Sequence, residues 1–344
     1  MKKYCFYALS LFAAAVLSVG MTSCGDDDDE KGGSGGGAVA ASDTPSPVIT
    51  DIYGVKHQVA SFLYKYSSND YDGYTYKYDT NGKLTGIYED NEKSVLTGPG
   101  LTFVDAGKDS NDEWNETSAF ALNSSGYVSG ASYSYSEKED DGEWEQGTGS
   151  ASFSYDGAGQ LTDVVYSFKG SYFDDGATYA FSYNGKYSLT WENSKLMSIK
   201  EDWSETDTGD DDGTETGTTL ISFEYGSQAN PARQWLWTMS GIMDAIEDFY
   251  GESLAPLGLF GRGPAYLPTQ YARSSSSSSG NSYNYPLSYT TNDNGLINSD
   301  NGYTYTYDTV NTTKVVVSPS QQGGRNKIRS IRQRFQNKKA AFAN

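Results

Sequence analysis

The sequence predicts an all-β protein, an antiparallel up-and-down meander that forms a curled sheet or a soluble barrel, with one amphipathic helix near residues 232–250. Three observations predict it. Aromatic residues alternate with hydroxyl or charged residues, one turn motif recurs along the chain, and short connections alternate with longer ones. Together they favour strands that follow one another in chain order.

Tyrosine occupies every second position between residues 74 and 78, with Thr and Lys between, and the same period recurs at 131–135, 152–155 and 303–307. One aromatic and one polar face are typical of half-buried antiparallel strands. The polar face argues against a membrane-embedded barrel, whose outer face must be apolar. The tyrosine hydroxyls need partners or water.

The recurring turn motif is an Asp or Asn followed three residues later by Gly. An Asp or Asn side chain can accept hydrogen bonds from the backbone that it turns, and Gly adopts the positive φ that a short hairpin loop needs. A shorter turn at Glu192, Asn193 and Ser194 is expected to do the same. The motif occurs as Asp79 with Gly82, Asn123 with Gly126, Asp156 with Gly159, and Asn292 with Gly295.

The connections are expected to be unequal in length. Compact turns at 79–82, 123–126, 156–159 and 192–194 alternate with longer acidic loops near 105–117, 137–148, 169–177 and 203–216. A meander would then carry turns at one end and loops at the other. Asn184 and Gly185 could form another hairpin, but a bulge within one long strand preserves the alternation and is preferred.

One segment breaks the β pattern. After Asn230 and Pro231, which suit a helix cap and first turn, apolar residues recur at spacings of four and three and predict a helix that covers the open face or end of the sheet. The glycine- and proline-containing stretch 254–268 is expected to be a loop that returns to strands after Tyr283. The helical stripe consists of Trp235, Met239, Ile242, Ile246 and Phe249.

The start of the chain predicts its destination. Lys2 and Lys3 precede an apolar run that is too short to span a membrane, so residues 1–23 are interpreted as a signal peptide. The tetrad at 21–24 resembles the lipobox of bacterial lipoproteins, and we expect Cys24 to be lipidated. Ordinary secretion with an incidental cysteine is the alternative. Cys5 lies within the removed segment, so the mature chain keeps a single cysteine and no disulfide framework.

An acidic run directly follows Cys24. It resembles the lipoprotein export signal of Bacteroidota, which favours the outer leaflet of the outer membrane and the cell surface; a solvated spacer is the alternative. Residues 24–50 are predicted to be an acidic, glycine-rich linker, 51–320 the β-meander domain and 321–344 a basic tail. The run comprises Asp26, Asp27, Asp28 and Asp29.

Charge excludes one class of partner. The mature chain has 23 basic and 45 acidic residues, so it would repel nucleic acid. Residues 325–344 carry seven basic residues and no acids, with Ile328, Ile331 and Phe335 at helical spacing. This tail is predicted to dock on the protein's own acidic loops; a disordered, solvated tail is the alternative.

The search for catalytic chemistry gives no catalytic residue, cofactor or metal site. His57 is the only histidine, so a Ser-His-Asp triad or a multi-histidine zinc site lacks its components. The acidic run 207–215 suggests calcium, but Thr208 and Thr219 occupy the first and twelfth positions of an EF-hand spacing, and diffuse attraction of cations is the preferred interpretation.

The chain resembles a family of Bacteroidota lipoproteins that carry a domain of unknown function with a porin-like fold. The resemblance covers residues 60–318 and depends on the Tyr-Asp/Asn-x-x-Gly-x-Leu hairpins, TWENSKLMSI at 190–199, GLFGRGPAYLPT at 258–269 and YTYTYD at 303–308. It implies a β meander or barrel and supplies no catalytic residues. The tail beyond Ser320 departs from the pattern.

Two classes of function remain. The first is a non-catalytic surface module for binding or adhesion to a glycan or a surface protein, tethered to the membrane at Cys24. Aromatic rings beside carboxylates suit sugars, although the same rings could simply anchor the loops. The second is a glycan hydrolase that uses loop carboxylates. The candidate ligand-binding residues are Trp114, Trp144 and Trp203, which the sequence places in the long loops.

Overall fold

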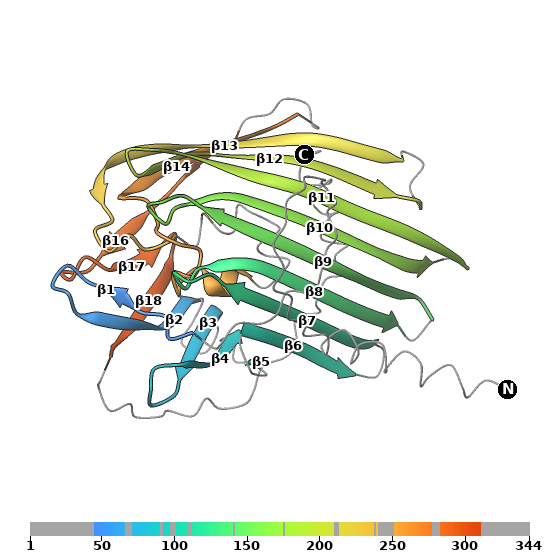
Figure 1. The fold of residues 1–344 in the computed structure, drawn as a ribbon, viewed down its shortest axis with the longest axis horizontal. Helices are drawn as coiled ribbons and strands as arrows, with labels where there is room; N and C mark the ends of the chain where they lie inside the picture. Colours follow the sequence, from blue (N-terminus) through green and yellow to red (C-terminus); the bar gives the residue numbers. More distant parts are fainter. Residues whose placement is uncertain are drawn as a thin grey trace, which may run out of the picture.

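The computed structural model describes residues 45–65, 71–89, 92–96, 101–108, 112–139, 142–174, 176–209, 213–236, 239, 251–276 and 283–310. Nearly all of these lie in antiparallel strands that follow one another in chain order, so the predicted all-β up-and-down meander is confirmed. The meander curls back on itself where the last strand, β18, pairs with β2, but it is not closed (Figure 1).

The first part of the sheet consists of short strands around the start of the domain. A two-residue strand, β1, pairs with the beginning of β2, and the chain then proceeds by neighbouring hairpins. The strands are β1 (Ile49–Thr50), β2 (Lys56–Lys65), β3 (Tyr71–Tyr78), β4 (Leu84–Glu89) and β5 (Glu92–Leu96).

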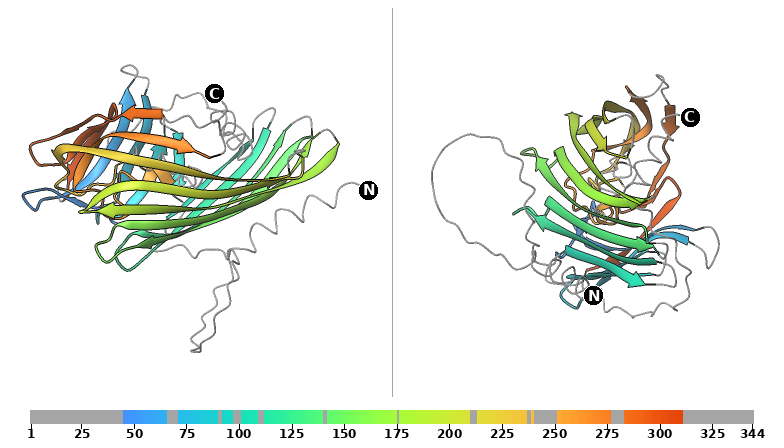
Figure 2. Two further views of the ribbon diagram at one scale, coloured as in Figure 1. Left: turned by 90° about the horizontal axis from the view of Figure 1, so that it is seen from above. Right: turned by 90° about the vertical axis from the view of Figure 1, so that its right-hand side faces the viewer.

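Long strands form the broad curved part of the sheet, which Figure 2 shows from above and from the right-hand side of Figure 1. They contain the segments predicted as acidic loops, and that prediction is wrong for most of each segment. Successive residues of a strand face opposite sides of the sheet, so acidic residues fit on both faces of these strands, and pairing continues through them. The strands are β6 (Leu101–Lys108), β7 (Asp112–Leu122), β8 (Val128–Glu139), β9 (Trp144–Tyr155), β10 (Leu161–Asp174), β11 (Ala177–Glu192), β12 (Lys195–Asp207) and β13 (Thr214–Ala229).

The predicted compact turns are confirmed. In the turn after β3, Asp79 Oδ1 accepts hydrogen bonds from the N–H groups of Asn81 and Lys83, and Gly82 has φ 79°. The turns after Asn123, Asp156 and Asn292 repeat these bonds. Between β11 and β12 the turn is made by two residues with positive φ, Asn193 and Ser194. The turns joining β7–β8, β9–β10 and β11–β12 lie together at the left end of the sheet in Figure 1.

Asn184 and Gly185 lie within one strand, as preferred, but without the expected bulge. Register across β10 and β12 is regular at both residues. Gly185 is needed there because a side chain would collide with Tyr166 of the neighbouring strand: a Cβ built on Gly185 would lie 2.3 Å from the Tyr166 hydroxyl oxygen.

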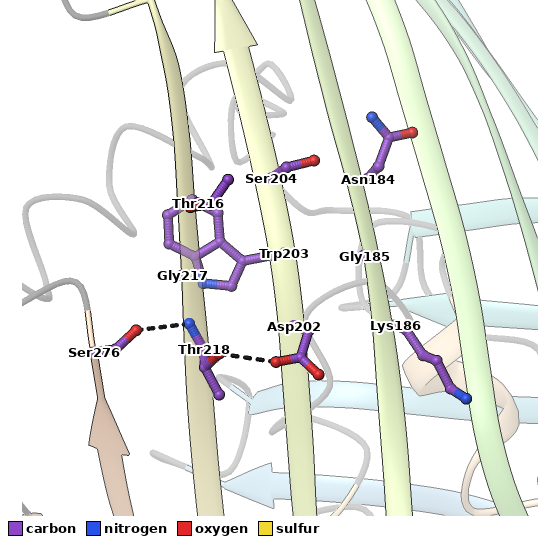
Figure 3. A pocket seen from close by; sticks show the side chains of 10 residues that line it. All are labelled: Asn184, Gly185, Lys186, Asp202, Trp203, Ser204, Thr216, Gly217, Thr218 and Ser276. Carbon is purple, nitrogen blue, oxygen red and sulfur yellow. Dashed lines mark hydrogen bonds between the residues drawn. The ribbon is translucent and has the colours of Figure 1, made fainter.

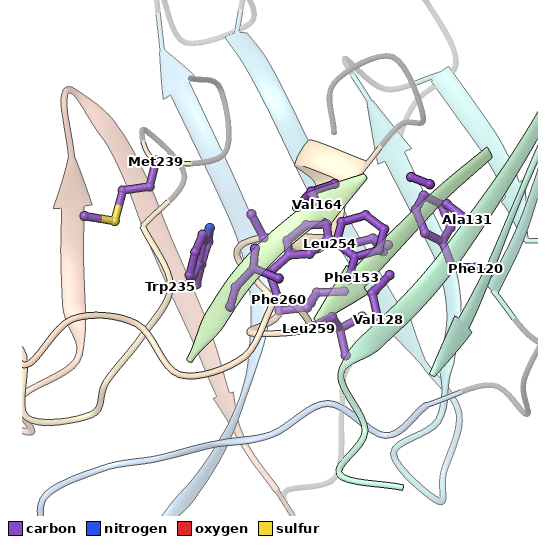
Figure 4. Close-up of a cluster of buried hydrophobic side chains, with 14 of the residues drawn as sticks. Phe120, Val128, Ala131, Phe153, Val164, Trp235, Met239, Leu254, Leu259 and Phe260 are labelled. Atoms are coloured by element: carbon purple, nitrogen blue, oxygen red, sulfur yellow. The ribbon is translucent and has the colours of Figure 1, made fainter. Parts of the chain in front are cut away.

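The predicted helix does not begin at Pro231. Arg233 has φ 52°, and residues 233–236 are not helical, because Asn230 instead closes a turn: its Nδ2 donates to the carbonyl oxygens of Gln234 and Pro264. Met239 is helical, and Ile242, Ile246 and Phe249 of the predicted stripe lie outside the described residues. Trp235 and Met239 are nevertheless buried against the sheet (Figure 4).

The loop that follows covers the end of the sheet where the compact turns lie. It begins with a single 3-10 turn, η1 (Gly251–Leu254), and places Leu254, Leu259 and Phe260 among core residues of β7–β10 (Figure 4). Backbone hydrogen bonds join it to three successive turns: Val128 N to Leu259 O, Arg262 N to Gly159 O, and Ala265 N to Ser194 O, each 2.8 Å. The loop is therefore part of the core rather than a simple connection.

The chain returns to strands at Tyr266, earlier than predicted. The remaining strands are β14 (Tyr266–Ser275), β15 (Tyr283–Pro286), β16 (Tyr289–Thr291), β17 (Ile297–Asp300) and β18 (Tyr303–Thr309). The predicted signal peptide, the predicted linker up to residue 44 and the predicted basic tail lie outside the described residues. Within the part of the chain that the structure describes, no helix has the length and hydrophobicity to cross a membrane.

Candidate functional site

The three predicted ligand-binding tryptophans lie in strands rather than loops, and the structure does not bring them together. Trp114 is in β7, Trp144 begins β9 and Trp203 is in β12. Four strands lie between β7 and β12, so five strand spacings of about 4.8 Å put Trp114 and Trp203 about 24 Å apart along the sheet. Their ligand-binding role stays a prediction, and a single site containing all three is excluded.

Two of these rings cover glycines on the inner, core-facing side of the sheet. A Cβ built on Gly107 would lie 2.3 Å from the Trp114 ring, and one built on Gly217 would lie 2.6 Å from the Trp203 ring. Trp203 also stacks on Tyr183, with ring centroids 6.1 Å apart. Trp144 alternates with the buried Glu145, so it lies on the outer side, where it stacks on Phe173. Packing therefore accounts for all three rings.

The inner face carries buried carboxylates that the sequence interpretation missed. Their partners are tyrosine hydroxyls from other strands: Tyr166 and Tyr172 of β10 reach across β11 and donate to Glu201 at 2.6 Å and to Asp207 at 3.0 Å, both in β12. Tyr135 donates in the same way to Glu145. The sequence did contain a signal for this burial: Glu201 is two residues from both Ile199 and Trp203, and a spacing of two places all three on the same, apolar face of a strand.

Burial fixes the protonation of these tyrosines. It raises the pKa of Tyr166 and of Tyr135 well above the ordinary value, and the nearby carboxylates Glu201 and Glu145 raise it further. Both hydroxyls therefore keep their protons and act as donors to the carboxylates. These carboxylates already accept hydrogen bonds, and the arrangement stabilises the interior of the sheet.

A shallow trough runs across the opposite, outer face of β11, β12 and β13, with a volume of about 550 Å³. We call it the outer trough. Its floor is the backbone of one cross-strand row, Gly185, Trp203 and Gly217, because all three positions face the inner side of the sheet. Side chains of the two adjoining rows form its walls (Figure 3). They are Asn184, Ser204 and Thr216 on one side, and Lys186, Asp202 and Thr218 on the other, with Ser276 at the edge.

The Asp202 carboxylate of the outer trough accepts a hydrogen bond on each of its two oxygens. Its Oδ1 accepts a hydrogen bond of 2.8 Å from the Thr218 hydroxyl, and its Oδ2 accepts one of 2.7 Å from Lys200 Nζ. The hydrogen bonds from Lys200 and Thr218 hold the pKa of Asp202 below its ordinary value. Lys186 is paired with Asp163 at 2.6 Å. The trough thus presents fixed donors and acceptors with its charges locally balanced.

Other predicted sites have different outcomes. Cys24 and the acidic run 26–29 lie outside the described residues. Asp207, from the segment considered for calcium, accepts hydrogen bonds from Tyr172 and from Gly209 N, and the described residues contain no cluster suited to a metal ion. His57 is buried and its Nε2 lies 2.9 Å from Asp51 Oδ2, which gives it a structural partner.

No protein-family model matches the sequence, and no curated protein matches it. Among solved structures, a porin-like protein from Bacteroides uniformis ATCC 8492 is similar, with 16% sequence identity and a TM-score of 0.41 over 72% of this chain and 95% of that one. A porin-like protein from Bacteroides vulgatus ATCC 8482 is similar at 13% identity and a TM-score of 0.39, over 70% of this chain and 90% of that one.

Proposed function

We propose that this chain is an outer-membrane lipoprotein displayed at the cell surface, whose β sheet is a non-catalytic binding module for a neutral glycan. The observation that carries the binding proposal is the outer trough. It provides an amide, an ammonium group, an ionised carboxylate and several hydroxyls within one concave strip of the sheet. Its volume is within the usual range of ligand sites.

The chemistry of the walls favours a neutral, hydroxyl-rich ligand. A sugar hydroxyl both donates and accepts, so it can use Asp202 as an acceptor and Asn184 or Lys186 as a donor. The opposite charges of Lys186 with Asp163 and of Asp202 with Lys200 compensate one another. A strongly charged ligand would have to break one of these pairs, whereas a neutral one would not.

The geometry favours binding over hydrolysis. Glycosidases use two carboxyl groups on either side of the scissile bond, about 5–10 Å apart. Among the described residues that line the outer trough, Asp202 is the single carboxylate. The inner carboxylates are buried under tyrosines. Of the predicted tryptophans, Trp203 remains in the proposal because its backbone forms part of the floor; Trp114 and Trp144 lie elsewhere.

The proposal is tested with a panel of neutral and acidic polysaccharides, measured for binding and for product release. Asp202→Asn removes the negative charge at nearly constant shape, and we expect it to weaken binding of the preferred neutral glycan about 5- to 15-fold, because a hydrogen bond to a charged acceptor becomes one to a neutral acceptor, a difference of about 1–1.5 kcal/mol. Glu224→Gln, an exposed change on β13 outside the trough, is the matched control and should leave the affinity unchanged.

Three outcomes would contradict the proposal. The first is equal affinity in both variants, the second is binding restricted to acidic polymers, and the third is release of reducing ends by the wild-type protein. A melting temperature measured for each variant ensures that a loss of affinity is not a loss of fold.

A further inference from the structure

The turn between β1 and β2 carries an unusual exposed apolar surface. Among the described residues eight large hydrophobic side chains are exposed, and four of them lie within residues 48–55. Tyr53 is 70% exposed and Ile52 is 51% exposed. We call Val48, Ile52, Tyr53 and Val55 the apolar turn.

The backbone of this turn is a further copy of the recurring Asp-x-x-Gly motif. Asp51 Oδ1 accepts hydrogen bonds from Tyr53 N and Val55 N, at 2.9 and 2.8 Å, and Gly54 has φ 80°. Asp79 makes the same two bonds in the turn after β3. The two turns therefore have the same hydrogen-bonded geometry, and their side chains can be compared position by position.

The fold does not require apolar residues in the middle of this turn. The four other copies of the motif hold small or polar residues there, and they form the same turn. Ile52 and Tyr53 leave half or more of their surface exposed, so packing within the chain does not account for their apolar character, and their presence points to a contact outside the chain. The corresponding pairs are Thr80 with Asn81, Ser124 with Ser125, Gly157 with Ala158, and Asp293 with Asn294.

The apolar turn lies where the chain enters the described fold. Pro45, the first described residue, accepts a hydrogen bond of 3.0 Å from Leu84 N, and Ile52 N donates to Asn294 O in the turn between β16 and β17. It lies at the left end of the sheet in Figure 1, together with the turns joining β7–β8, β9–β10 and β11–β12. The hairpin ends with the most acidic residues, such as Glu139 and Asp174, lie at the opposite end.

We propose that the apolar turn inserts into the lipid surface to which Cys24 anchors the chain, and so sets the orientation of the sheet. This inference rests on the proposed lipid anchor. A linker of the length and composition of residues 24–44 has a typical span of about 25 Å, which keeps this end of the sheet near the membrane. Tyr53 has the amphipathic ring that favours the interface, and Val48, Ile52 and Val55 suit the acyl boundary. The acidic hairpin ends then point away from anionic headgroups.

The test supplies the anchor chemically, so that it does not depend on natural lipidation. The mature chain 24–344 retains every described strand, and Cys24 is its single cysteine. Its thiol is coupled to a maleimide-headgroup lipid in phosphatidylcholine vesicles whose acyl chains are brominated. Tyr53→Trp places a fluorescent reporter in the apolar turn. Leu220→Trp places one at an exposed position on the sheet face, 40% exposed in the wild-type protein.

We expect the bromolipid to quench the added emission of the Tyr53→Trp protein at least twofold, and to leave that of Leu220→Trp unchanged. Equal quenching in both proteins would overturn the proposal. Because the lipid anchor is supplied chemically, this quenching result does not depend on lipidation in cells. If Cys24 were not lipidated in cells, the proposed function would fail, but the quenching result would be unchanged.

A second measurement uses the uncoupled chain and co-sedimentation with the same vesicles without bromine. Ile52→Thr with Tyr53→Asn gives the turn the central residues found at Thr80 and Asn81, and we expect several-fold less bound protein at an unchanged melting temperature. Val165→Thr, at a position 48% exposed on β10, is the control and should bind as the wild type does. An unaffected double variant would overturn the proposal. A combination of two results would also overturn it: residue 53 cross-links to a protein on whole cells, and the bromolipid quenches Tyr53→Trp no more than it quenches Leu220→Trp.

Discussion

At the scale of single residues, several buried polar groups are held by hydrogen-bond partners from other strands of the sheet. The tyrosine–carboxylate pairs of the inner face join separate strands, as Tyr166 does with Glu201. Asp51 and His57 are close in sequence, but both are buried only because β1 and β18 flank the start of β2. Each such group is retained because burial without a partner would be costly.

Asp51 gives a pH dependence with a definite sign. Burial alone would raise the pKa of its carboxyl group, but the hydrogen bonds from His57 and from the N–H groups of Val55 and Tyr53 outweigh burial and lower that pKa. A lowered pKa in the folded state stabilises the protein above the unfolded pKa of about 4, and this stabilisation is lost as the pH falls through the folded value.

We therefore expect Asp51→Asn to lower the melting temperature at pH 7, and this difference from the wild type should shrink below about pH 4. Asp79→Asn is the control, because Asn123 and Asn292 form the same turn with an amide and Asp79 has no histidine partner in the equivalent turn. A melting difference for Asp51→Asn that stays constant from pH 7 to pH 2.5 would contradict the assignment.

At the scale of elements, the recurring turn decides where the strands begin and end. Its hydrogen bonds are all within five residues, so each copy forms independently of the rest of the sheet. The position that tolerates substitution least is the glycine with positive φ, since a β-branched residue is strained there.

Gly82→Val and Gly159→Val should each lower the free energy of unfolding by about 1–2 kcal/mol, the cost of a left-handed conformation for an L-residue. Both should cost more than this strain alone, because the added carbon lies 3.1 Å from the Tyr127 ring at Gly159 and 3.1 Å from Gln58 Nε2 at Gly82. Gly157→Val, in the same turn but without positive φ and with open space around it, should change stability by less than about 0.5 kcal/mol. Denaturant unfolding curves measure all three, and equal stability of Gly157→Val and Gly159→Val would show that the turn geometry is wrong.

At the scale of the whole molecule, the sheet has two ends of different character. One end carries the compact turns, the loop from η1 to β14, and the apolar turn; the other carries long acidic hairpins (Figure 1). A tethered surface protein with this asymmetry would present the acidic end and the outer trough to the surroundings.

The destination of the chain is tested in cells. Cys24→Ala should release the protein from membranes, because acylation requires the thiol. Replacing Asp26, Asp27, Asp28 and Asp29 with Ala should keep the protein in the membrane fraction but hide it from external protease. Unchanged protease sensitivity of this second variant would refute the export role of the acidic run.

The sequence by itself determined the fold class, the positions of the compact turns and the face on which most residues lie. These features depend on local physics: a turn is closed by its own Asp or Asn and Gly, and the period of two assigns Tyr133 or Phe153 to the core without knowledge of the partner strand. The same local reasoning failed for the acidic segments, which were predicted to be loops because of their charge. Acidic residues such as Glu113 and Glu139 lie in paired strands, because a strand accommodates charge on its exposed face and at its ends.

Only the tertiary structure decided what the chemistry-bearing residues do. The three tryptophans lie apart because their strands, β7, β9 and β12, are not neighbours. Two of the rings pack over glycines of a paired strand, a contact that sequence spacing does not encode. The outer trough combines Lys186, Asp202 and Thr218 because they fall in one cross-strand row, a matter of register between three strands. Register is set by turn geometry together with which face of each strand is buried, so contacts between strands are not determined by any one segment alone.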